Sequence, residues 1–187
     1  KYSSDPADIT NDNAGSDVLP AANSFQEQGG DIFQADLAAS FGANLLWNTR
    51  IGVTRQELNA FPQGGRLDLA GHTDNNGVLP DSLNYTNAQF SKRDRDELGS
   101  DLTWFVSALG DHQVKFGAGL ADLAFSSENF TVSGYRYEDD GSDPFILWFE
   151  PNAGKADYEG SQTTLFVQDS WNPTSRLSLN LGLRDDQ

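Results

Sequence analysis

The stretch LSLNLGLRD (residues 177–185) alternates strictly between two kinds of residue. Successive side chains of a β-strand point to opposite faces, so this stretch predicts a strand with one leucine face and one small or polar face. Both a soluble sheet and a membrane barrel use such strands, and they differ in what touches each face. The leucine face carries Leu177, Leu179, Leu181 and Leu183, and the other face carries Ser178, Asn180, Gly182 and Arg184.

Composition narrows the class of protein. The chain has 187 residues and a formal net charge of -16, which disfavours binding to nucleic acid because phosphate backbones are repelled. It has no Cys, so no disulfide or thiolate site exists. No stretch approaches 18 consecutive apolar residues, which excludes a transmembrane helix but not transmembrane strands. The sequence contains no Met and begins without a signal peptide, so we expect a section of a longer polypeptide.

The same period-two alternation recurs in six segments, which pair across short turns into three hairpins. Long polar segments, rich in Gly, Asn, Asp and Pro, separate the hairpins. The predicted strands are about 31–41, 44–56, 97–109, 113–125, 162–171 and 176–185, and the predicted loops are 1–30, 57–96 and 126–161.

The strict alternation of short turns and long loops favours a barrel. Structureless loops longer than about 15 residues are uncommon in compact soluble domains. An outer-membrane β-barrel has short periplasmic turns and long extracellular loops, and its strands need about 9 to 11 residues to cross the membrane. We therefore expect an all-β fold, an antiparallel meander of about six strands that forms part of a large transmembrane β-barrel.

The face opposite the leucines supports the same reading. Arg50 and Lys115 share it with mid-strand glycines such as Gly117, which suits a wide lumen, although the outer face of an ordinary antiparallel sheet would look similar. Aromatic residues near strand ends are expected in an interfacial girdle, while core packing is the alternative. These aromatic residues are Phe41, Trp47, Trp104 and Trp171.

Three stretches resemble segments of TonB-dependent outer-membrane receptors, and one of these is similar to the large Oar-like members. They are DHQVKFGAGLADLAF (residues 111–125), LFVQDSWNPTSRLSLNLGLRDD (165–186) and GANLLWNTRIGVTR (42–55). The Q-D-x-W hairpin of the second stretch is the most specific match. Two positions depart from the family pattern: Asp185 stands where the family usually has Tyr, and Phe166 stands where it usually has Tyr or another aromatic residue. The loops match no segment of the family.

The resemblance implies a function and a location. Receptors of this kind have about 22 strands and an N-terminal plug, so the plug and the remaining strands are absent from this sequence. They sit in the bacterial outer membrane, bind a small nutrient ligand (an iron chelate, an oligosaccharide or a peptide) and import it with the TonB complex, which pulls on the plug. A surface lipoprotein is a further candidate partner, and outer-membrane lipid surrounds the barrel. The resemblance implies no cofactor and no catalytic residue. The expected lumen-facing residues are Asn48, Arg50, Lys115, Gln168, Asn180 and Arg184.

The histidines and acidic residues of the sequence give little support for a catalytic or metal-binding site. His72 and His112 fall in predicted loops on opposite rims, so a histidine-based catalytic or metal site has no basis. One acidic cluster could supply oxygen ligands to Ca²⁺, but it lacks the ordered spacing of a calcium loop and is more simply a solvated run of charge. The cluster contains Glu138, Asp139, Asp140 and Asp143.

Two other classes of protein remain as alternatives. A secreted or surface β-sandwich that binds carbohydrate or protein would need a second apolar layer over the leucine face. A passive channel would share the barrel but lack the plug and the energy coupling.

Overall fold

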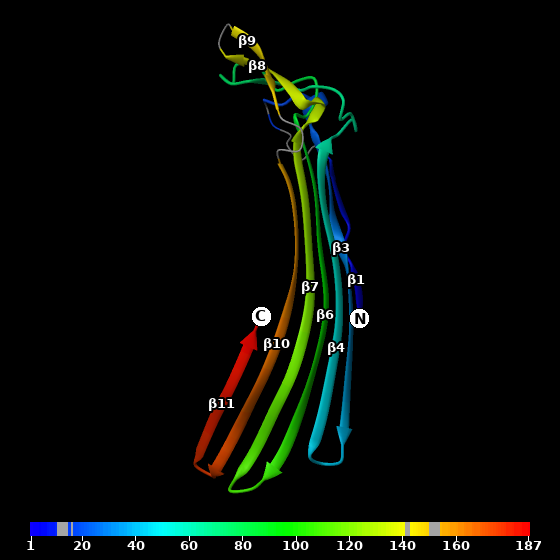
Figure 1. The fold of residues 1–187 in the computed structure, drawn as a ribbon. Coiled ribbons are helices and arrows are strands. Elements are labelled where there is room, and N and C mark those ends of the chain that lie inside the picture. Colours follow the sequence, from blue (N-terminus) through cyan, green and yellow to red (C-terminus); the bar gives the residue numbers. More distant parts are fainter. Residues whose placement is uncertain (11–14, 16, 141–142, 150–153) are drawn as a thin grey trace.

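A single long antiparallel sheet dominates the computed structural model, which describes residues 1–10, 15, 17–140, 143–149 and 154–187. Its hydrogen-bonded order is β1-β3-β4-β6-β7-β10-β11, with β2 paired to β3 (Figure 1). Each of the three sequence-predicted hairpins is present, and neighbours along the chain are neighbours in the sheet. The strands are β1 (Tyr2–Ser4), β2 (Ala7–Thr10), β3 (Ser24–Phe41), β4 (Leu45–Pro62), β6 (Asn87–Ser107), β7 (Asp111–Thr131), β10 (Gly154–Thr174) and β11 (Leu177–Asp186).

Tight turns gather at one end of this sheet and the long connections at the other (Figure 1). At the turn end, Gly42 and Gly110 have positive φ angles of 67° and 116°, which glycine adopts without strain. A Cβ atom on Gly110 would also lie 2.5 Å from the Asn172 carbonyl oxygen, so this turn requires glycine. The separation of turns from long connections agrees with the layout that the sequence predicts.

A second, three-stranded sheet stands at the end with the long connections. It has the order β5-β8-β9, with β5 parallel to β8 and β8 antiparallel to β9. We call this sheet and its connecting segments the cap. Its strands are β5 (His72–Asp74), β8 (Tyr135–Asp140) and β9 (Asp143–Trp148), and the 3₁₀ turns near it are η1 (Pro20–Ala22) and η2 (Val132–Gly134).

The long strands extend well beyond the predicted boundaries. β6, β7 and β10 each contain 21 residues, about twice the length that crosses a membrane. The predicted loops are correspondingly shorter, because 24–30, 57–62, 87–96, 126–131 and 154–161 are strand. These extensions carry polar residues on both faces, so they lack the alternation of apolar and polar residues that predicts a strand. They are strands nevertheless, because the backbone hydrogen bonds of a sheet do not depend on that alternation.

Cross-strand register places the large apolar side chains on one face, which we call the apolar face. Phe41 pairs with Leu45, Leu45 with Trp104 and Trp104 with Val114, so one row continues across four strands. The next row joins Trp47, Leu102 and Phe116 in the same way. In each of these strands, the mostly apolar residues of this face occupy every second position over a span of about nine residues, which is close to the length that crosses a membrane. Examples of these spans are 33–41, 45–53 and 98–106. The predicted girdle residues Phe41, Trp47, Trp104 and Trp171 all have this facing and lie toward the turn end.

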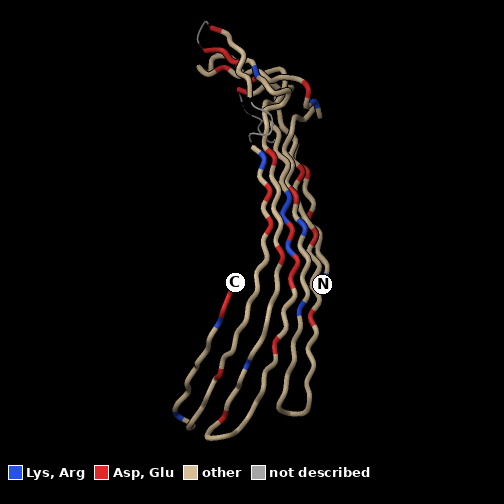
Figure 2. Tube along the Cα trace, viewed as in Figure 1, with Lys and Arg blue, Asp and Glu red and all other residues tan. Residues whose placement is uncertain are grey.

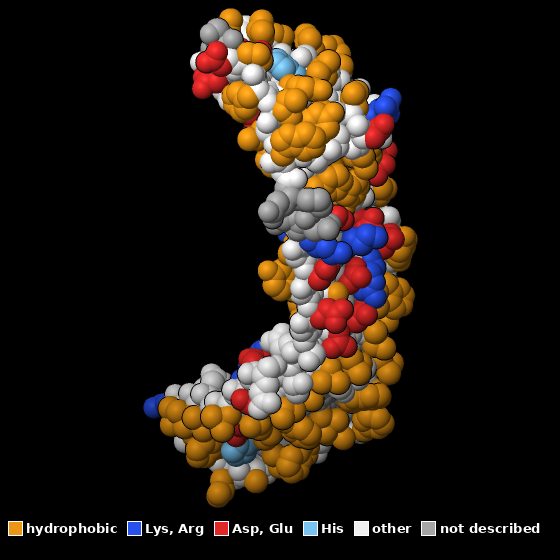
Figure 3. All heavy atoms as spheres, turned by 45° about the horizontal axis from the view of Figure 1, so that its top comes forward, with side chains coloured by type: hydrophobic (Ala, Val, Ile, Leu, Met, Phe, Trp, Pro, Cys, Tyr) orange, Lys and Arg blue, Asp and Glu red, His pale blue; other side chains and the backbone are white. Residues whose placement is uncertain are grey.

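Nothing among the described residues forms a second layer over the apolar face. Leu183 and Leu37 are 79% and 54% exposed. Figure 3 shows apolar side chains covering the end that holds the turns. A sandwich would bury these leucines, so the sandwich alternative is wrong for the part of the chain that is described. The buried apolar residues are few and mostly small: Ala22, Ala70, Ala88, Ala121 and Val132.

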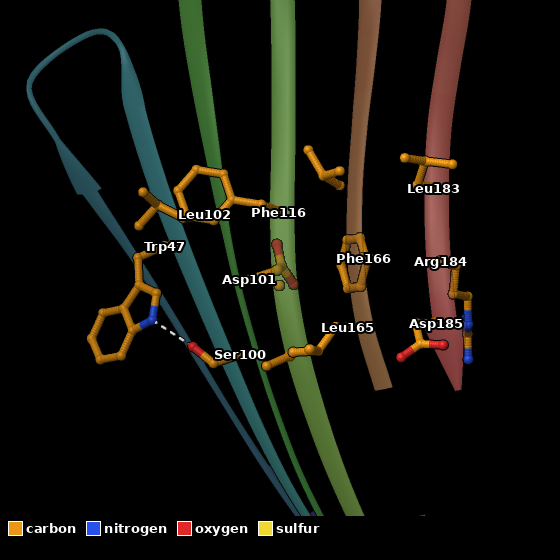
Figure 4. A pocket seen from close by; sticks show the side chains of 13 residues that line it. Trp47, Ser100, Asp101, Leu102, Phe116, Leu165, Phe166, Leu183, Arg184 and Asp185 are labelled. Carbon is orange, nitrogen blue, oxygen red and sulfur yellow. Dashed lines mark hydrogen bonds between the residues drawn. The ribbon is translucent and has the colours of Figure 1, made fainter. Parts of the chain in front are cut away.

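The part of the apolar face nearest the turns, which we call the apolar band, also contains polar side chains that bond to one another. The Trp47 indole donates to the Ser100 hydroxyl at 2.8 Å (Figure 4), and the Thr49 and Ser100 hydroxyls lie 2.9 Å apart. Trp47 and Ser100 border a shallow hollow of about 870 Å³ that is lined mainly by apolar side chains. Asp185 also borders it, and the structure does not explain a carboxylate on this face.

On the side that carries the leucines, charged residues are concentrated beyond the apolar band, toward the cap. Figure 2 shows charged residues gathered in the middle part of the long strands, with fewer of them toward the turns. Arg55 pairs with Asp96 at 2.7 Å, and Lys92 pairs with Glu57 at 2.9 Å. Exposed ion pairs of this kind are stable in water but not in hydrocarbon. They therefore mark the boundary of the apolar band on the side of the cap. Within the described residues, no helix has the length and hydrophobicity needed to span a membrane.

A pair of arginine substitutions at adjacent positions tests which face meets lipid. Leu37 lies on the apolar face and Ala38 on the opposite one, beside Asp36. We expect Leu37→Arg to destabilise the folded barrel by about 2–4 kcal/mol, because a charge would enter hydrocarbon, and Ala38→Arg to have little effect. The measurement is urea unfolding of the membrane-inserted protein. Equal effects of the two substitutions would contradict this assignment of the faces.

Candidate functional site: the polar face and the cap

All six residues predicted to face the lumen lie on the face opposite the leucines, which we call the polar face. They come from four strands, and the cross-strand register places all of them on the same face. For example, Gln168 pairs with Lys115, and both share the face with Asn180. That this face lines a lumen stays a prediction. The six are Asn48 and Arg50 on β4, Lys115 on β7, Gln168 on β10, and Asn180 and Arg184 on β11.

Two acidic residues neutralise the central cations of this face. The Arg50 guanidinium lies 2.6 Å from an Asp36 carboxylate oxygen, and the Lys115 ammonium lies 3.2 Å from Asp101. The Asn48 amide also donates to Asp101 at 3.1 Å. Neither aspartate was predicted from the sequence, although both lie on strands next to their partners and point to the same face. The centre of the polar face is thus a paired network rather than a free positive patch.

Gly117 makes room for an aromatic ring on this face. A Cβ atom at this position would lie 2.8 Å from the Phe166 ring, so the ring rests against the glycine backbone. The Lys115 ammonium lies 5.9 Å from the centre of the same ring, within the range of a cation–π contact. The K-F-G motif and Phe166, two residues before Q-D, therefore meet across β7 and β10.

A hollow of about 730 Å³ lies along the polar face. Arg50, Lys115 and Arg184 line it together with Asp36 and Asp101. Its charged side chains come from different strands, so the sheet gathers residues that are distant in sequence.

Farther from the turns, an aromatic row follows on the polar face. Arg93, Phe125 and Tyr158 pair in register across β6, β7 and β10. The Arg93 guanidinium carbon lies 5.5 Å from the centre of the Phe125 ring, and the Phe125 and Tyr158 rings are stacked at 6.1 Å. This row could not be predicted from the sequence, because alternation within one hairpin does not give the register between hairpins.

His72 connects three segments of the cap by hydrogen bonds. His72 Nε2 lies 3.0 Å from the Asp139 carboxylate, and His72 Nδ1 lies 3.3 Å from the Ser82 hydroxyl. Ser82 and His72 also exchange two backbone hydrogen bonds of 3.0 Å. This Ser–His–Asp chain links a loop, β5 and β8, and we interpret it as a structural connection.

A buried carboxylate provides a second connection. Glu138 is 4% exposed, accepts a hydrogen bond from Asn75 at 3.0 Å and forms an ion pair with Arg136. Burial raises the pKa of Glu138, but the hydrogen bonds from Asn75 and Arg136 outweigh burial, so the pKa lies below its ordinary value.

The loop after β5 is organised by one aspartate. The Asp74 carboxylate accepts backbone N–H bonds from Leu79, Asn76 and Val78 at 2.7–3.0 Å. These bonds, that from Leu79 foremost, hold the pKa of Asp74 below its ordinary value.

The acidic cluster is not assembled as a calcium site. Within the described residues, no group of three or more His, Cys, Asp or Glu side chains is placed to hold a metal ion. Glu138 binds Arg136 and Asn75, whereas Asp139 binds His72. Successive residues of β8 point to opposite faces, so Glu138 and Asp139 are separated, while Asp140 pairs in register with Asp143 on β9.

His112 lies at the other end of the molecule, as the sequence predicts. Its Nδ1 atom is 2.7 Å from Asp169, and its ring stacks on Trp171 at 5.3 Å. The Trp171 indole donates to the Leu109 carbonyl oxygen at 3.1 Å. These contacts explain why Asp169 interrupts the leucine face: it anchors the β6–β7 turn to β10.

Comparison with known proteins agrees with this geometry. The family model described as "TonB dependent receptor-like, beta-barrel" matches residues 1–187. The chain belongs to the TonB-dependent receptor β-barrel family. No curated protein and no solved structure matches the chain. TonB-dependent receptors are outer-membrane transporters rather than enzymes, and they act on a nutrient ligand with TonB. The Oar-like subtype stays a prediction.

Removing the charge of Glu138 tests the cap of this TonB-dependent receptor. We expect Glu138→Gln to destabilise the cap by about 2 kcal/mol, because the charged partner of Arg136 is lost in a buried site. Amide hydrogen exchange in β8 should then accelerate about 30-fold. Asp143→Asn, a change at an exposed acid on β9, is the matched control and should leave exchange unchanged. Similar exchange rates in both variants would contradict the assignment.

Acid should open the cap of the receptor. Glu138 and Asp74 have lowered pKa values in the folded state, so their stabilisation is complete above their ordinary values of 4.5 and 3.8 and is lost as the pH falls through the folded values. Asp81 acts in the opposite direction, because burial raises its pKa. Amide exchange of 72–82, corrected for intrinsic rates, should be flat from pH 7 to about 5 and rise below about 4. Protection that persists unchanged to pH 2 would refute this.

Proposed function

We propose that this chain is one section of the barrel wall of an Oar-like TonB-dependent receptor that imports a small nutrient ligand across the bacterial outer membrane. The observation that carries the proposal is the single-layer sheet with an uncovered apolar face and a polar face of paired charges. In hydrocarbon the exposed leucines gain the apolar surroundings that the chain itself does not supply.

The open edges of the sheet support the idea that further strands complete the barrel. β11 pairs with β10 only between Thr164 and Thr174, and β1 covers only Asp31–Phe33 of β3. Unpaired backbone groups cost several kcal/mol each in lipid, so a stable barrel requires more strands on both sides. We place those strands and the plug elsewhere in the same polypeptide.

Ligand capture is assigned to the end that bears the cap. The extended strands and the cap stand beyond the apolar band, where they would rise from the outer leaflet into the medium. Candidate ligands are an iron chelate, an oligosaccharide or a peptide, and a surface lipoprotein is a candidate partner at the same end. No covalent chemistry is part of this function.

Fractionation and conductance test the proposal without knowledge of the ligand. The protein that carries this chain should fractionate with the outer membrane and show the heat-dependent gel mobility of a barrel. In planar lipid bilayers a plugged receptor should give no steady conductance. A soluble protein would refute the location, and a steady open conductance would favour a passive channel instead.

Uptake experiments test the energy coupling separately. Cells with and without TonB are offered a radiolabelled ferric catecholate, a neutral hexasaccharide mixture and a hexapeptide mixture. We expect uptake of at least one probe to require both the receptor and TonB. Receptor-dependent uptake that persists without TonB would refute energy coupling.

A further inference from the structure

We infer that the polar face beyond the apolar band binds a neutral oligosaccharide, an inference that rests on the proposed transport function and names its substrate class. The surface is the polar face of 24–32, 54–62, 87–95, 123–131 and 154–160, which we call the upper wall. Its residues differ in chemistry both from the centre of the polar face and from the opposite side of the same strands.

The two sides of these strands carry different polar groups. The side continuous with the apolar face carries full charges, including Asp31, Arg55, Glu57, Lys92 and Asp94. The upper wall carries mainly uncharged amides and hydroxyls, and among its described strand positions there is no carboxylate. Its amides and hydroxyls include Gln28, Gln56, Gln89, Ser91, Ser127 and Asn129.

Two hollows lie along these amides. One, of about 380 Å³, is lined by Gln28, Gln56, Gln89 and Arg93, with Asp5 from the segment between β1 and β2 also on its lining. The other, of about 370 Å³, is lined by polar groups of β6 and β7 together with two aromatic residues from the connecting segments. Gln89 lines both hollows, so they adjoin at this side chain. The residues of the second hollow include Tyr85, Asn87, Gln89, Asn129 and Phe149.

Amide side chains suit sugar hydroxyls. A sugar hydroxyl both donates and accepts hydrogen bonds, and a Gln or Asn amide offers one acceptor oxygen and two donor hydrogens. Several of these groups already bond to one another, as Gln89 does to Ser91 at 3.2 Å and Ser91 to Ser127 at 3.1 Å. Such bonds fix the positions of these side chains along the upper wall before a ligand binds.

The aromatic row supplies the second element of sugar recognition. Tyr158 is 66% exposed and stacks on Phe125 with an interplanar angle of 21°, so the two rings form a platform on the polar face. The face of an aromatic ring carries partial negative charge and attracts the polarised C–H groups of a pyranose ring. Arg93 lies against Phe125 and also lines the first hollow, which places platform and amides side by side.

Charge argues against the other ligand classes. An anionic iron chelate calls for several unpaired cations, but the upper wall offers Arg93 over a ring, while Arg95 pairs with Glu97 at 2.9 Å. A cationic peptide calls for unpaired carboxylates. The lining of the first hollow includes Asp5 and Glu57, and Glu57 already pairs with Lys92 at 2.9 Å. A neutral ligand with many hydroxyl groups matches this surface best.

Calorimetry on the intact receptor in detergent tests the inference. The probes are maltohexaose, cellohexaose, xylohexaose and mannohexaose, with a ferric catecholate and a hexapeptide mixture as competing classes. We expect at least one hexasaccharide to bind. Tyr158→Ala should weaken that binding at least 10-fold and Gln89→Ala at least 5-fold, because each removes one element of the site. Tyr158→Phe, which keeps the ring, should stay within about 3-fold of the wild type.

Matched controls separate binding from folding. Glu159 follows Tyr158 on β10, and Asn59 pairs with Phe90, the residue after Gln89, but both side chains lie on the side opposite the upper wall. Glu159→Ala and Asn59→Ala should therefore leave the affinity within 2-fold of the wild type. Heat-dependent gel mobility verifies that each variant is folded. If a folded Tyr158→Ala binds the sugar like the wild type, the upper wall is not the site.

The remaining outcomes distinguish the two proposals. Failure of all four hexasaccharides to bind overturns the inference, as does binding of the ferric catecholate or a peptide in their place. Neither result contradicts the proposed function, because outer-membrane location and conductance are measured without a ligand, and dependence on TonB is measured with all three ligand classes.

Discussion

The continuous antiparallel register is the constraint on which the structure depends. Paired residues in a β-ladder share a face, and a slip of one residue would move every side chain of a strand to the other face. From β3 to β11 the register keeps the leucines on one face and the central charges on the other. The single shift between β10 and β11 falls between Trp171 and Thr174, beside the turn, where it disturbs few pairs.

Because the register is continuous, the polar face can assemble a network that no single hairpin contains. Lys115 comes from β7, Asp101 from β6 and Asn48 from β4, yet their polar atoms meet within 3.2 Å. Phe166 from β10 completes the group over Gly117. The carboxylates of Asp36 and Asp101 pair with the central cations Arg50 and Lys115, so the centre of this face is polar but its charges are paired. The aromatic row and the amides farther along then offer a surface of different chemistry on the same strands.

The sequence predicted some parts of this arrangement well and others poorly, for physical reasons. Leucine alternation and turn residues such as Gly42 and Gly110 are local signals, so the three hairpins and the facing of Arg50 or Gln168 could be read directly. The extensions beyond the apolar band could not, because both of their faces meet water and no alternation is required. The cap was missed for a related reason: its strands are short and held by specific contacts such as His72 with Asp139. The run of acids around Glu138 was only a weak candidate for calcium, since a solvated run of charge explained it more simply, and the partners of Glu138 and Asp139 could not be read from the sequence.

By itself the sequence determined that this chain forms two-faced strands joined by tight turns, since period-two alternation and glycine turns are properties of short segments. It also contained the motifs that mark the TonB-dependent receptor family. Only the tertiary structure decided which strands lie side by side, how far they rise above the apolar band, and which residues from different hairpins meet. The reason is that pairing between hairpins is set by backbone hydrogen bonds over long sequence separations, and those bonds leave no local pattern in the side chains.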